Sequence, residues 1–441
     1  MSTRSDRAAH DAIVVGAGAA GLAAAAELSA GGRSVLVLEA RDRIGGRIWT
    51  REAAGAPVPV ELGAEFIHGR SGAIFGLLQR ADSFAVDAPV SHWMKRGGRL
   101  QQDEGLFDQV RRVMEPASAL REDVSIEDWL QGPETRDASA EVRDLVRMMV
   151  EGFDGADPKR ASALAIAAEW SGGAASESQY RPFGGYGPLM RRLAALLDPD
   201  RAALRLQCVV EEVRWERGRV EVRARTPAGP ASFSGRCAVI TLPLGVLKLS
   251  SGAEPPVRFS PSLDAKRAAL EMLEPAPVVK AVLELGSSFW ESTDDGRYRD
   301  ASFFHVPDEA FPTFWTSLPY RTPQLVAWAG GPKAGVLTGL SADALAARAI
   351  SSLGAIFGSS QQVGAELRSI RVHDWQSDPY ARGAYSYVAV GGSGARGELA
   401  KALADTLFFA GEATDAGDDA TTVTGALASG KRAAREVLDC I

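Results

Sequence analysis

The first 40 residues alternate apolar and glycine-rich segments in an order that predicts a strand, a helix and a second strand. Residues 12–15 form a short continuous apolar run, which is typical of a buried strand. An alanine-rich stretch follows, and a second expected strand at 34–38, apolar after Ser34, ends on the acidic residue Glu39. Parallel strands need a helical crossover between them, so this order predicts a βαβ unit at the start of the chain.

The rest of the chain mixes both periodicities without an internal repeat or a low-complexity linker. Residues 58–69 predict a short strand and a glycine-bounded turn, and residues 73–197 predict a mostly helical region. Further strands are expected at 204–213, 220–224, 238–242, 278–285, 302–305, 325–330, 368–375 and 406–410, and further helices at 263–273, 342–353 and 424–438.

The glycines between the first strand and the first helix indicate a dinucleotide-binding turn. Gly16 permits a tight turn, Gly18 lets the backbone approach a pyrophosphate, and Gly21 lets helix and strand pack closely. The N-terminus of the helix offers free N–H groups and a partial positive charge to the phosphates. Glu39 can accept hydrogen bonds from a ribose. The motif therefore predicts a dinucleotide cofactor.

Three distant segments favour FAD over NAD. In residues 45–47, two glycines allow close approach of the backbone, and Arg47 can neutralise a pyrophosphate. Residues 408–414 place Glu412 at the end of a buried strand, where it could bind sugar-like hydroxyls. Residues 421–434 begin a helix whose dipole could stabilise a reduced flavin. The alternatives are a solvated arginine, an exposed acid at a strand end and an ordinary C-terminal helix.

These patterns together predict an α/β fold with two interleaved domains. A Rossmann-like FAD-binding domain is expected from residues 1–85, 198–255 and 395–441. An α+β substrate-binding domain is expected from residues 86–197 and 256–394.

Composition restricts the classes of protein further. Of the 441 residues, 46% are hydrophobic and 24% are charged, as in soluble globular proteins. The net charge of -7 argues against a nucleic-acid-binding protein. No apolar run approaches the roughly 18 residues of a membrane span, and the first residues lack an apolar signal core, so we expect a cytoplasmic enzyme with no membrane partner. Cys208, Cys237 and Cys440 have no metal-ligand spacing, so no metal is expected.

Taken together, the motifs resemble the flavin-dependent amine oxidase family, which includes monoamine oxidases, polyamine oxidases and lysine-specific histone demethylases. The matching segments are GAGAAGLAAA, LEARDRIGGR, VELGAEFIHG, FGGYGPLM, VITLPLGVLK, VVKAVLEL, WQSDPYARGAYSYV, FAGEAT and GALASGKRAA. The resemblance implies FAD as the cofactor. It also implies oxidation of an amine to an imine, which hydrolyses to an aldehyde or ketone, while oxygen is reduced to hydrogen peroxide.

The resemblance also implies particular cofactor contacts. Glu39 and Arg47 match the family's ribose and pyrophosphate contacts, Glu412 its ribityl contact, and Val210 an adenine contact. Ala384 stands where monoamine oxidases carry the cysteine that bonds the flavin, so FAD is expected to be noncovalent. The expected cofactor-binding residues are Gly16, Gly18, Ala20, Gly21, Glu39, Ala40, Arg41, Gly46, Arg47, Gly63, Ala64, Glu65, Val210, Gly411, Glu412, Thr422 and Val423.

Five residues are expected at the reacting end of the flavin. Lys280 matches a lysine linked through water to flavin N5, where a cation favours reduction of oxygen; a solvent-facing lysine at a strand edge is the alternative. Trp375 and Tyr385 match aromatic residues beside the flavin. Thr422 stands in place of a second aromatic wall, which implies an open site. His68 matches a histidine near the substrate of polyamine oxidases, or is a hydrogen-bonded histidine in a turn.

The expected substrate is a polyamine or another primary or secondary amine. Glu65 could pair with a second ammonium group, or could be a structural acid beside the turn. Phe66 stands where L-amino acid oxidases carry a carboxylate-binding arginine, which argues against an amino-acid substrate. The alternatives are a desaturase or porphyrinogen-type oxidase, an L-amino acid oxidase, and a binding subunit that retains FAD structurally. A homodimer is one of the oligomeric states left open.

Overall fold

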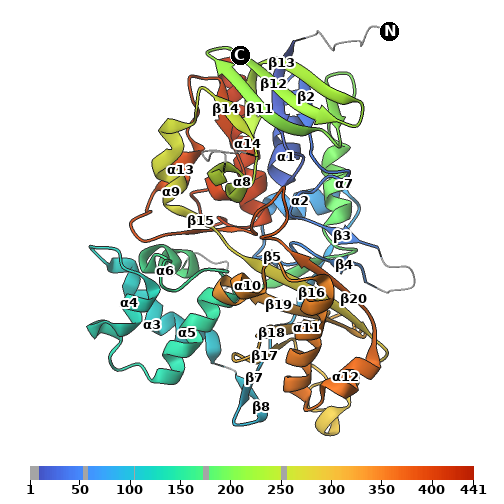
Figure 1. The fold of residues 1–441 in the computed structure, drawn as a ribbon, viewed down its shortest axis with the longest axis vertical. Helices are drawn as coiled ribbons and strands as arrows, with labels where there is room; N and C mark the ends of the chain where they lie inside the picture. Colours follow the sequence, from blue (N-terminus) through green and yellow to red (C-terminus); the bar gives the residue numbers. More distant parts are fainter. Residues whose placement is uncertain (1–8, 53–57, 104, 172–177, 250–255) are drawn as a thin grey trace.

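The computed structural model describes residues 9–52, 58–103, 105–171, 178–249 and 256–441. Two large sheets organise these residues, and each sheet draws its strands from separate parts of the chain (Figure 1). The predicted α/β class is confirmed. Most of the polar N-terminal segment used in the signal-peptide argument, residues 1–8, lies outside the described residues.

The first sheet has eight strands with a buried parallel core. β1 (His10–Val15) lies between β2 (Val35–Leu38) and β13 (Gly229–Ile240) and runs parallel to both. β2 is buried along its whole length, which explains its continuous run of valine and leucine. With α1 (Ala19–Ala30) between β1 and β2, the predicted βαβ unit is confirmed. The other strands are β10 (Ala202–Arg205), β11 (Val209–Glu216), β12 (Arg219–Thr226), β14 (Arg258–Ser260) and β22 (Leu407–Phe409).

The second sheet has seven strands and carries Lys280 on an interior strand, next to the edge strand. β16 (Val278–Leu285) lies between β19 (Gln324–Gly330) and β20 (Leu367–Asp374), antiparallel to both. All of β16 is buried apart from Glu284. Lys280 is therefore inside the protein and does not face solvent at a strand edge. The sheet continues through β18 (Thr313–Thr316), β17 (Phe303–His305), β7 (His92–Arg96) and β8 (Arg99–Asp103).

The first and last helices pack against each other beside the first sheet, as Figure 1 shows for the blue α1 (Ala19–Ala30) and the red α14 (Val423–Cys440). A Cβ atom at Gly430 would overlap the backbone carbonyl of Ala20, so only glycine allows this approach. The ends of the sequence thus meet at the dinucleotide turn. Helices α2 (Gly72–Arg80), α7 (Gly187–Ala194), α8 (Leu244–Leu249), α9 (Arg267–Glu271) and α13 (Ala395–Ala400) complete this half of the molecule.

The second sheet is covered by helices from two regions. Leu345 and Leu353 of α11 (Ala342–Phe357) pack with Val279 and Leu283 of β16 in one apolar core. The helices between residues 106 and 171 form a separate group at the lower left of Figure 1. The helices not yet named are α3 (Leu106–Met114), α4 (Ile126–Gln131), α5 (Ala140–Gly152), α6 (Ala163–Ser171), α10 (Gly331–Leu337) and α12 (Ser360–Glu366).

Three small sheets join the two halves. Their strands are β3 (Thr50–Arg51) with β4 (Val60–Glu61), β5 (Ile67–His68) with β9 (Gln179–Pro182) and β6 (Ala85–Ala88), and β15 (Leu273–Pro275) with β21 (Ser386–Val388).

The prediction of a mostly helical region over 73–197 is wrong where β6, β7, β8 and β9 occur. β7 and β8 form a hairpin around Gly97-Gly98, both of which have positive φ. A glycine pair between two short strands is a known hairpin signal, and it outweighs the weak helical pattern here.

Two other predicted elements also differ. The strand expected over 204–213 is two strands, because the chain turns at Gln207 (φ 54): β10 runs parallel to β2, whereas β11 pairs antiparallel with β12. The helix expected over 263–273 is reduced to a 3₁₀ turn followed by α9, since Leu273 begins β15. The division into two domains stays a prediction. β14 belongs to the first sheet, although it lies beyond residue 255, where the second segment of the predicted FAD-binding domain ends.

Neither a membrane span nor a metal cluster is evident in the described ranges. No described helix is both long and apolar enough to cross a bilayer. No group of three or more His, Cys, Asp or Glu side chains in these ranges is placed to hold a metal ion. Cys208 and Cys237 are buried and Cys440 is exposed, and all three thiols are free.

Candidate active site

A cavity of about 610 Å³ extends from the first sheet to the second. On one side it is lined by the segments that follow β1, β2 and β22, at the carboxyl ends of parallel strands, where open α/β sheets bind ligands. On the other side it is lined by Lys280 of β16, Trp315 of β18 and Trp328 of β19. The cavity therefore joins the predicted nucleotide site to the second sheet.

The structure brings the predicted site residues together around this single cavity, apart from Gly21. A Cβ atom at Gly21 would overlap the carbonyl oxygen of Gly16, so Gly21 serves the close packing of α1 on β1. The predicted residues that line the cavity are Gly16, Gly18, Ala20, Glu39, Ala40, Arg41, Gly46, Arg47, Gly63, Ala64, Glu65, His68, Val210, Lys280, Trp375, Tyr385, Gly411, Glu412, Thr422 and Val423.

The turn between β1 and α1 has the geometry of a phosphate cradle. Gly16 has φ 108, which disfavours any other residue, and the N-cap Gly18 places no side chain over the start of α1. The first N–H groups of the helix are thus left for a ligand in the cavity. Glu39 accepts hydrogen bonds from the N–H groups of Ala17 (2.8 Å) and Arg41 (2.9 Å). These features fit a bound dinucleotide.

Replacing Gly21 with alanine should therefore displace α1 and weaken cofactor binding. We expect Gly21→Ala to lose about 3 kcal/mol of stability and to purify with less FAD per polypeptide, because overpacking against backbone is poorly relieved. Flavin absorbance and a urea unfolding curve measure both effects. Gly76→Ala is the matched control: it lies in α2 with open space around it and should gain up to about 1 kcal/mol.

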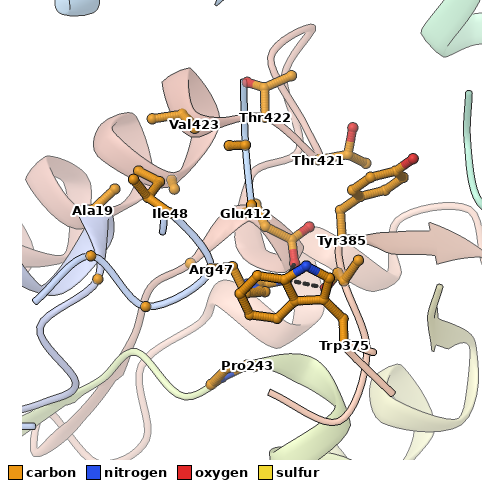
Figure 2. Close-up of a pocket in the computed structure, with 18 of the residues that line it drawn as sticks. Ala19, Arg47, Ile48, Pro243, Trp375, Tyr385, Glu412, Thr421, Thr422 and Val423 are labelled. Carbon is orange, nitrogen blue, oxygen red and sulfur yellow. Dashed lines mark hydrogen bonds and ion pairs between the residues drawn. The ribbon is translucent and has the colours of Figure 1, made fainter. Parts of the chain in front are cut away.

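A chain of buried polar contacts fixes Arg47 and Glu412. Arg47 pairs with Glu412 Oε1 at 2.8 Å and also donates to the carbonyl of Ala384. Glu412 Oε2 accepts from the hydroxyl of Ser386 (2.7 Å), which also contacts Arg396. Burial would raise the pKa of Glu412, but Arg47 and Arg396 hold it below its usual value. Figure 2 shows the ion pair in the cavity wall together with Trp375.

Arg41 has a partner that the sequence did not indicate. Its guanidinium forms two hydrogen bonds with Asp378, at 3.0 and 2.7 Å. Burial opposes ionisation of Asp378, but hydrogen bonds from His373 and Arg41 hold its pKa well below the ordinary range. Arg41 lines the cavity while its charge is already balanced.

Lys280 lies in a buried cluster of charges. Its ammonium group donates to Glu65 Oε2 at 2.7 Å and to the carbonyl of Gly63 at 3.1 Å, and it lies 5.3 Å from the ring centroid of Trp315. Glu65 pairs with Arg181 as well and accepts a hydrogen bond from the indole N–H of Trp315. Burial opposes ionisation of Glu65, but Lys280 and Arg181 hold its pKa below the usual value. Glu65 is thus committed to protein partners, which favours the structural interpretation of this acid over a substrate contact.

The aromatic end of the cavity is held by backbone contacts. The indole of Trp375 donates to the carbonyl of Leu62 (3.0 Å), and the hydroxyl of Tyr385 donates to the carbonyl of Phe153 (2.6 Å). Thr422 caps α14 by accepting a hydrogen bond from Gly425 at 3.1 Å. These bonds fix the orientation of both aromatic rings at the cavity wall.

His68 faces the same region as a neutral imidazole. Burial lowers its pKa to about 4, and its Nδ1 atom is buried without a hydrogen-bond partner in the described part of the chain. The interpretation of His68 as a hydrogen-bonded histidine in a turn is therefore not favoured for this nitrogen. An unpaired nitrogen at a cavity wall is a candidate contact for a bound ligand.

Asp154 and Thr421 are among the cavity-lining residues that were not predicted from the sequence. Asp154 is 8% exposed, and its carboxylate accepts hydrogen bonds only from the indole of Trp170, at 3.2 and 3.3 Å, among the contacts described. Burial and the nearby Glu169 raise its pKa well above the ordinary value. Thr421 has φ 68, an uncommon conformation for a β-branched residue. The only local sequence signal at Asp154 is the Asp-Gly pair that it forms with the next residue. Such pairs usually indicate a turn and do not point to a binding site.

Residues 19–438 match the family described as flavin containing amine oxidoreductase. Because the match covers nearly the whole chain, the chain belongs to this family, and FAD is its cofactor. Among proteins of similar sequence, Polyamine oxidase 3 of Oryza sativa subsp. japonica is 29% identical over 460 residues, covering 96% of this chain and 88% of the relative.

Two longer relatives are histone demethylase homologues of Arabidopsis thaliana. Lysine-specific histone demethylase 1 homolog 3 is 29% identical over 97% of this chain, and homolog 2 is 30% identical over 97%. The chain spans 30% and 58% of these two proteins.

Among solved structures, putrescine oxidase bound to putrescine is 23% identical with a TM-score of 0.80, covering 98% of this chain and 99% of that chain. Cyclohexylamine oxidase from Brevibacterium oxydans is 22% identical with a TM-score of 0.77, over the same shares. Both structures share the fold of this chain.

Proposed function

We propose that this chain is an FAD-dependent oxidase that converts a primary or secondary amine to an imine and reduces oxygen to hydrogen peroxide. A di- or polyamine is the favoured substrate. The observation that carries this proposal is the single cavity, which joins the nucleotide cradle to a buried lysine, two fixed aromatic rings and the buried carboxyl group of Asp154. The imine would hydrolyse to an aldehyde or ketone.

The cofactor would be held without a covalent bond. The first turn of α1 and Arg47 would bind the pyrophosphate, Glu39 the ribose, and Glu412 the ribityl chain. Ala384 offers no sulfur for attachment. When bound, FAD accepts two electrons and a hydrogen from the carbon next to the amine nitrogen.

The chain's own residues would position the amine and keep water away. Tyr385 and Trp375 form apolar walls, and Thr422 leaves the opposite side open. The neutral imidazole of His68 can accept a hydrogen bond from an uncharged amine. Burial and Glu169 favour the neutral acid of Asp154 when no cation is present, and a second ammonium group on the same molecule would draw it into the ionised form. Asp154 is available for that pairing because no Arg, Lys or His of the described residues pairs with it.

Anaerobic reduction of the flavin tests this proposal. Absorbance of the oxidised flavin should disappear with a di- or polyamine, more slowly with a monoamine, and not with an amino acid. Phe66 lines the cavity where an amino-acid carboxylate would need a cation, and the nearby Arg181 is paired with Glu65. Reduction by a non-amine alone would favour a desaturase or porphyrinogen-type oxidase, and no reduction at all would favour a binding subunit.

The cellular setting follows from the sequence and stays a prediction. We propose a cytoplasmic protein whose partners are a small-molecule amine and oxygen. Its oligomeric state is open, and a homodimer is one of the states to be tested. Cell fractionation and size-exclusion chromatography with light scattering test these two points.

A further inference from the structure

A second cavity, of about 90 Å³, lies behind Glu65. Glu65 lines both cavities, and among the residues that the structure describes it is the one they share. A cavity of this volume holds several waters if polar groups line it. Phe183, which is 49% exposed, is part of its wall, so the cavity lies close to the surface. Its polar lining consists of Glu61, Glu65, Arg181, Ser317, Tyr320 and Gln324.

Glu61 is the acid of this cavity whose bonding is incomplete. It is 7% exposed, and its Oε1 atom accepts hydrogen bonds from the hydroxyl of Thr50 and the N–H of Tyr186, both at 2.7 Å. Its Oε2 atom is buried without a hydrogen-bond partner in the described ranges, and so is the hydroxyl of Tyr320. One oxygen of Glu61 therefore has a structural role, and the other remains for water.

The groups around Glu61 determine its protonation. Burial raises its pKa to about 7, which outweighs the hydrogen bonds from Thr50 and Tyr186 and the attraction of Lys280, while Glu65 adds to the rise. Glu61 can thus carry or release a proton near neutral pH.

We propose that this second cavity holds water and, with Glu61 and Glu65, forms the path by which protons from solvent reach Lys280. This inference rests on the proposed oxidase function. Lys280 already donates to Glu65 and to the carbonyl of Gly63, which leaves one of its three N–H groups for the main cavity that it lines.

The oxidase reaction consumes one proton, which this path would supply. Hydride leaves a neutral amine, so the product iminium keeps its N–H protons. Oxygen that has accepted two electrons and one hydrogen is a hydroperoxide anion, which needs one proton to leave as hydrogen peroxide. An N–H bond of Lys280 breaks as the O–H bond forms. Glu65 is ionised and acts as a relay: it takes a proton from Glu61 through water as it passes one to Lys280, and Glu61 then regains its proton from solvent.

Glu61→Gln separates this role from a structural one. The amide oxygen can keep both hydrogen bonds of Oε1, while the side chain no longer carries a proton. We expect dithionite-reduced holoenzyme of this variant to be reoxidised by oxygen about tenfold more slowly than the wild type at pH 7. Anaerobic reduction by the amine should not change, and Glu61→Asp should recover part of the rate.

A second readout does not depend on turnover. Between pH 4.5 and about 7, native Glu61 keeps a proton that the unfolded chain has lost, so the stability of the wild type should fall as pH rises through this window. In Glu61→Gln, the free energy of unfolding measured in urea should fall less over this pH window than in the wild type. Parallel stability curves would overturn the proposal, because Glu61 would then carry no proton near neutral pH.

The outcomes distinguish this path from the function on which it rests. Reoxidation of Glu61→Gln at the wild-type rate, or faster, overturns the path alone; a faster rate would mean that Glu61 acts only through its negative charge. Failure of oxygen to reoxidise the reduced wild type overturns the oxidase function, and the path with it.

Discussion

Replacing Lys280 with methionine should slow the reaction of the reduced enzyme with oxygen about 100-fold or more. Lys280 is 1% exposed and contacts the main cavity, so its charge is not screened by solvent where oxygen would be reduced. Oxygen gains negative charge in that step, and a fixed cation lowers its energy. Stopped-flow mixing of reduced holoenzyme with oxygenated buffer measures the rate.

The reduction of the flavin by the amine should change far less in Lys280→Met, since the hydride step places no negative charge on oxygen. Lys266→Met is the matched control. Lys266 is equally buried, at 2% exposure, but it donates to the carbonyls of Glu398 and Lys401 and does not line the cavity. Equal losses of oxygen reactivity in both variants would contradict the prediction, because a general effect of losing a buried lysine would then explain the result.

Replacing Asp154 with asparagine should raise the KM for a diamine about 100-fold and leave the KM for a monoamine of similar length nearly unchanged. Loss of one partner of a buried charge pair costs about 2–5 kcal/mol, and about 1.4 kcal/mol corresponds to a factor of ten. Initial rates with both substrates measure the difference. The selectivity between the two amines is the quantity of interest, because a general defect would affect both alike.

Glu169→Gln is the control for this prediction. Glu169 lies close enough to Asp154 to raise its pKa, but it pairs with Arg396 at 3.3 Å and does not line the cavity. This variant should keep the preference for diamines. If Asp154→Asn keeps the preference as well, Asp154 does not bind the second ammonium group.

The sequence was most informative where local conformation and chemistry coincide. The positive φ of Gly16 and the overlap at Gly21 are properties of a turn a few residues long, so the motif alone was enough to predict them. The position of Lys280 was harder to predict, because an alternating pattern of apolar and polar residues does not distinguish an interior strand from an edge strand. The resemblance to a family resolved that choice, and the position of β16 between β19 and β20 agrees with it.

The interactions that the sequence did not reveal are contacts between residues far apart in the chain. Glu65 pairs with Arg181 and Lys280, which are 116 and 215 residues away in the chain. From the sequence alone, Asp154 resembles a turn residue. In the folded protein it lies between the end of α5 and the segment around Tyr385. The hydrogen bond from Tyr385 to the carbonyl of Phe153, which spans 232 residues, shows how closely they meet. A local pattern of apolar and polar residues cannot predict contacts between residues this far apart in the chain.

The packing of α1 against α14 has a consequence for biosynthesis. The dinucleotide turn follows β1, near the start of the described chain, yet Gly411, Glu412, Thr422 and Val423 complete the cavity from the other end of the sequence. β1 also needs β13 as a neighbour before its sheet is closed. A nascent chain still on the ribosome can form the first strand and helix, but it has no place for the cofactor. We therefore expect the complete FAD site to form only after translation has passed α14.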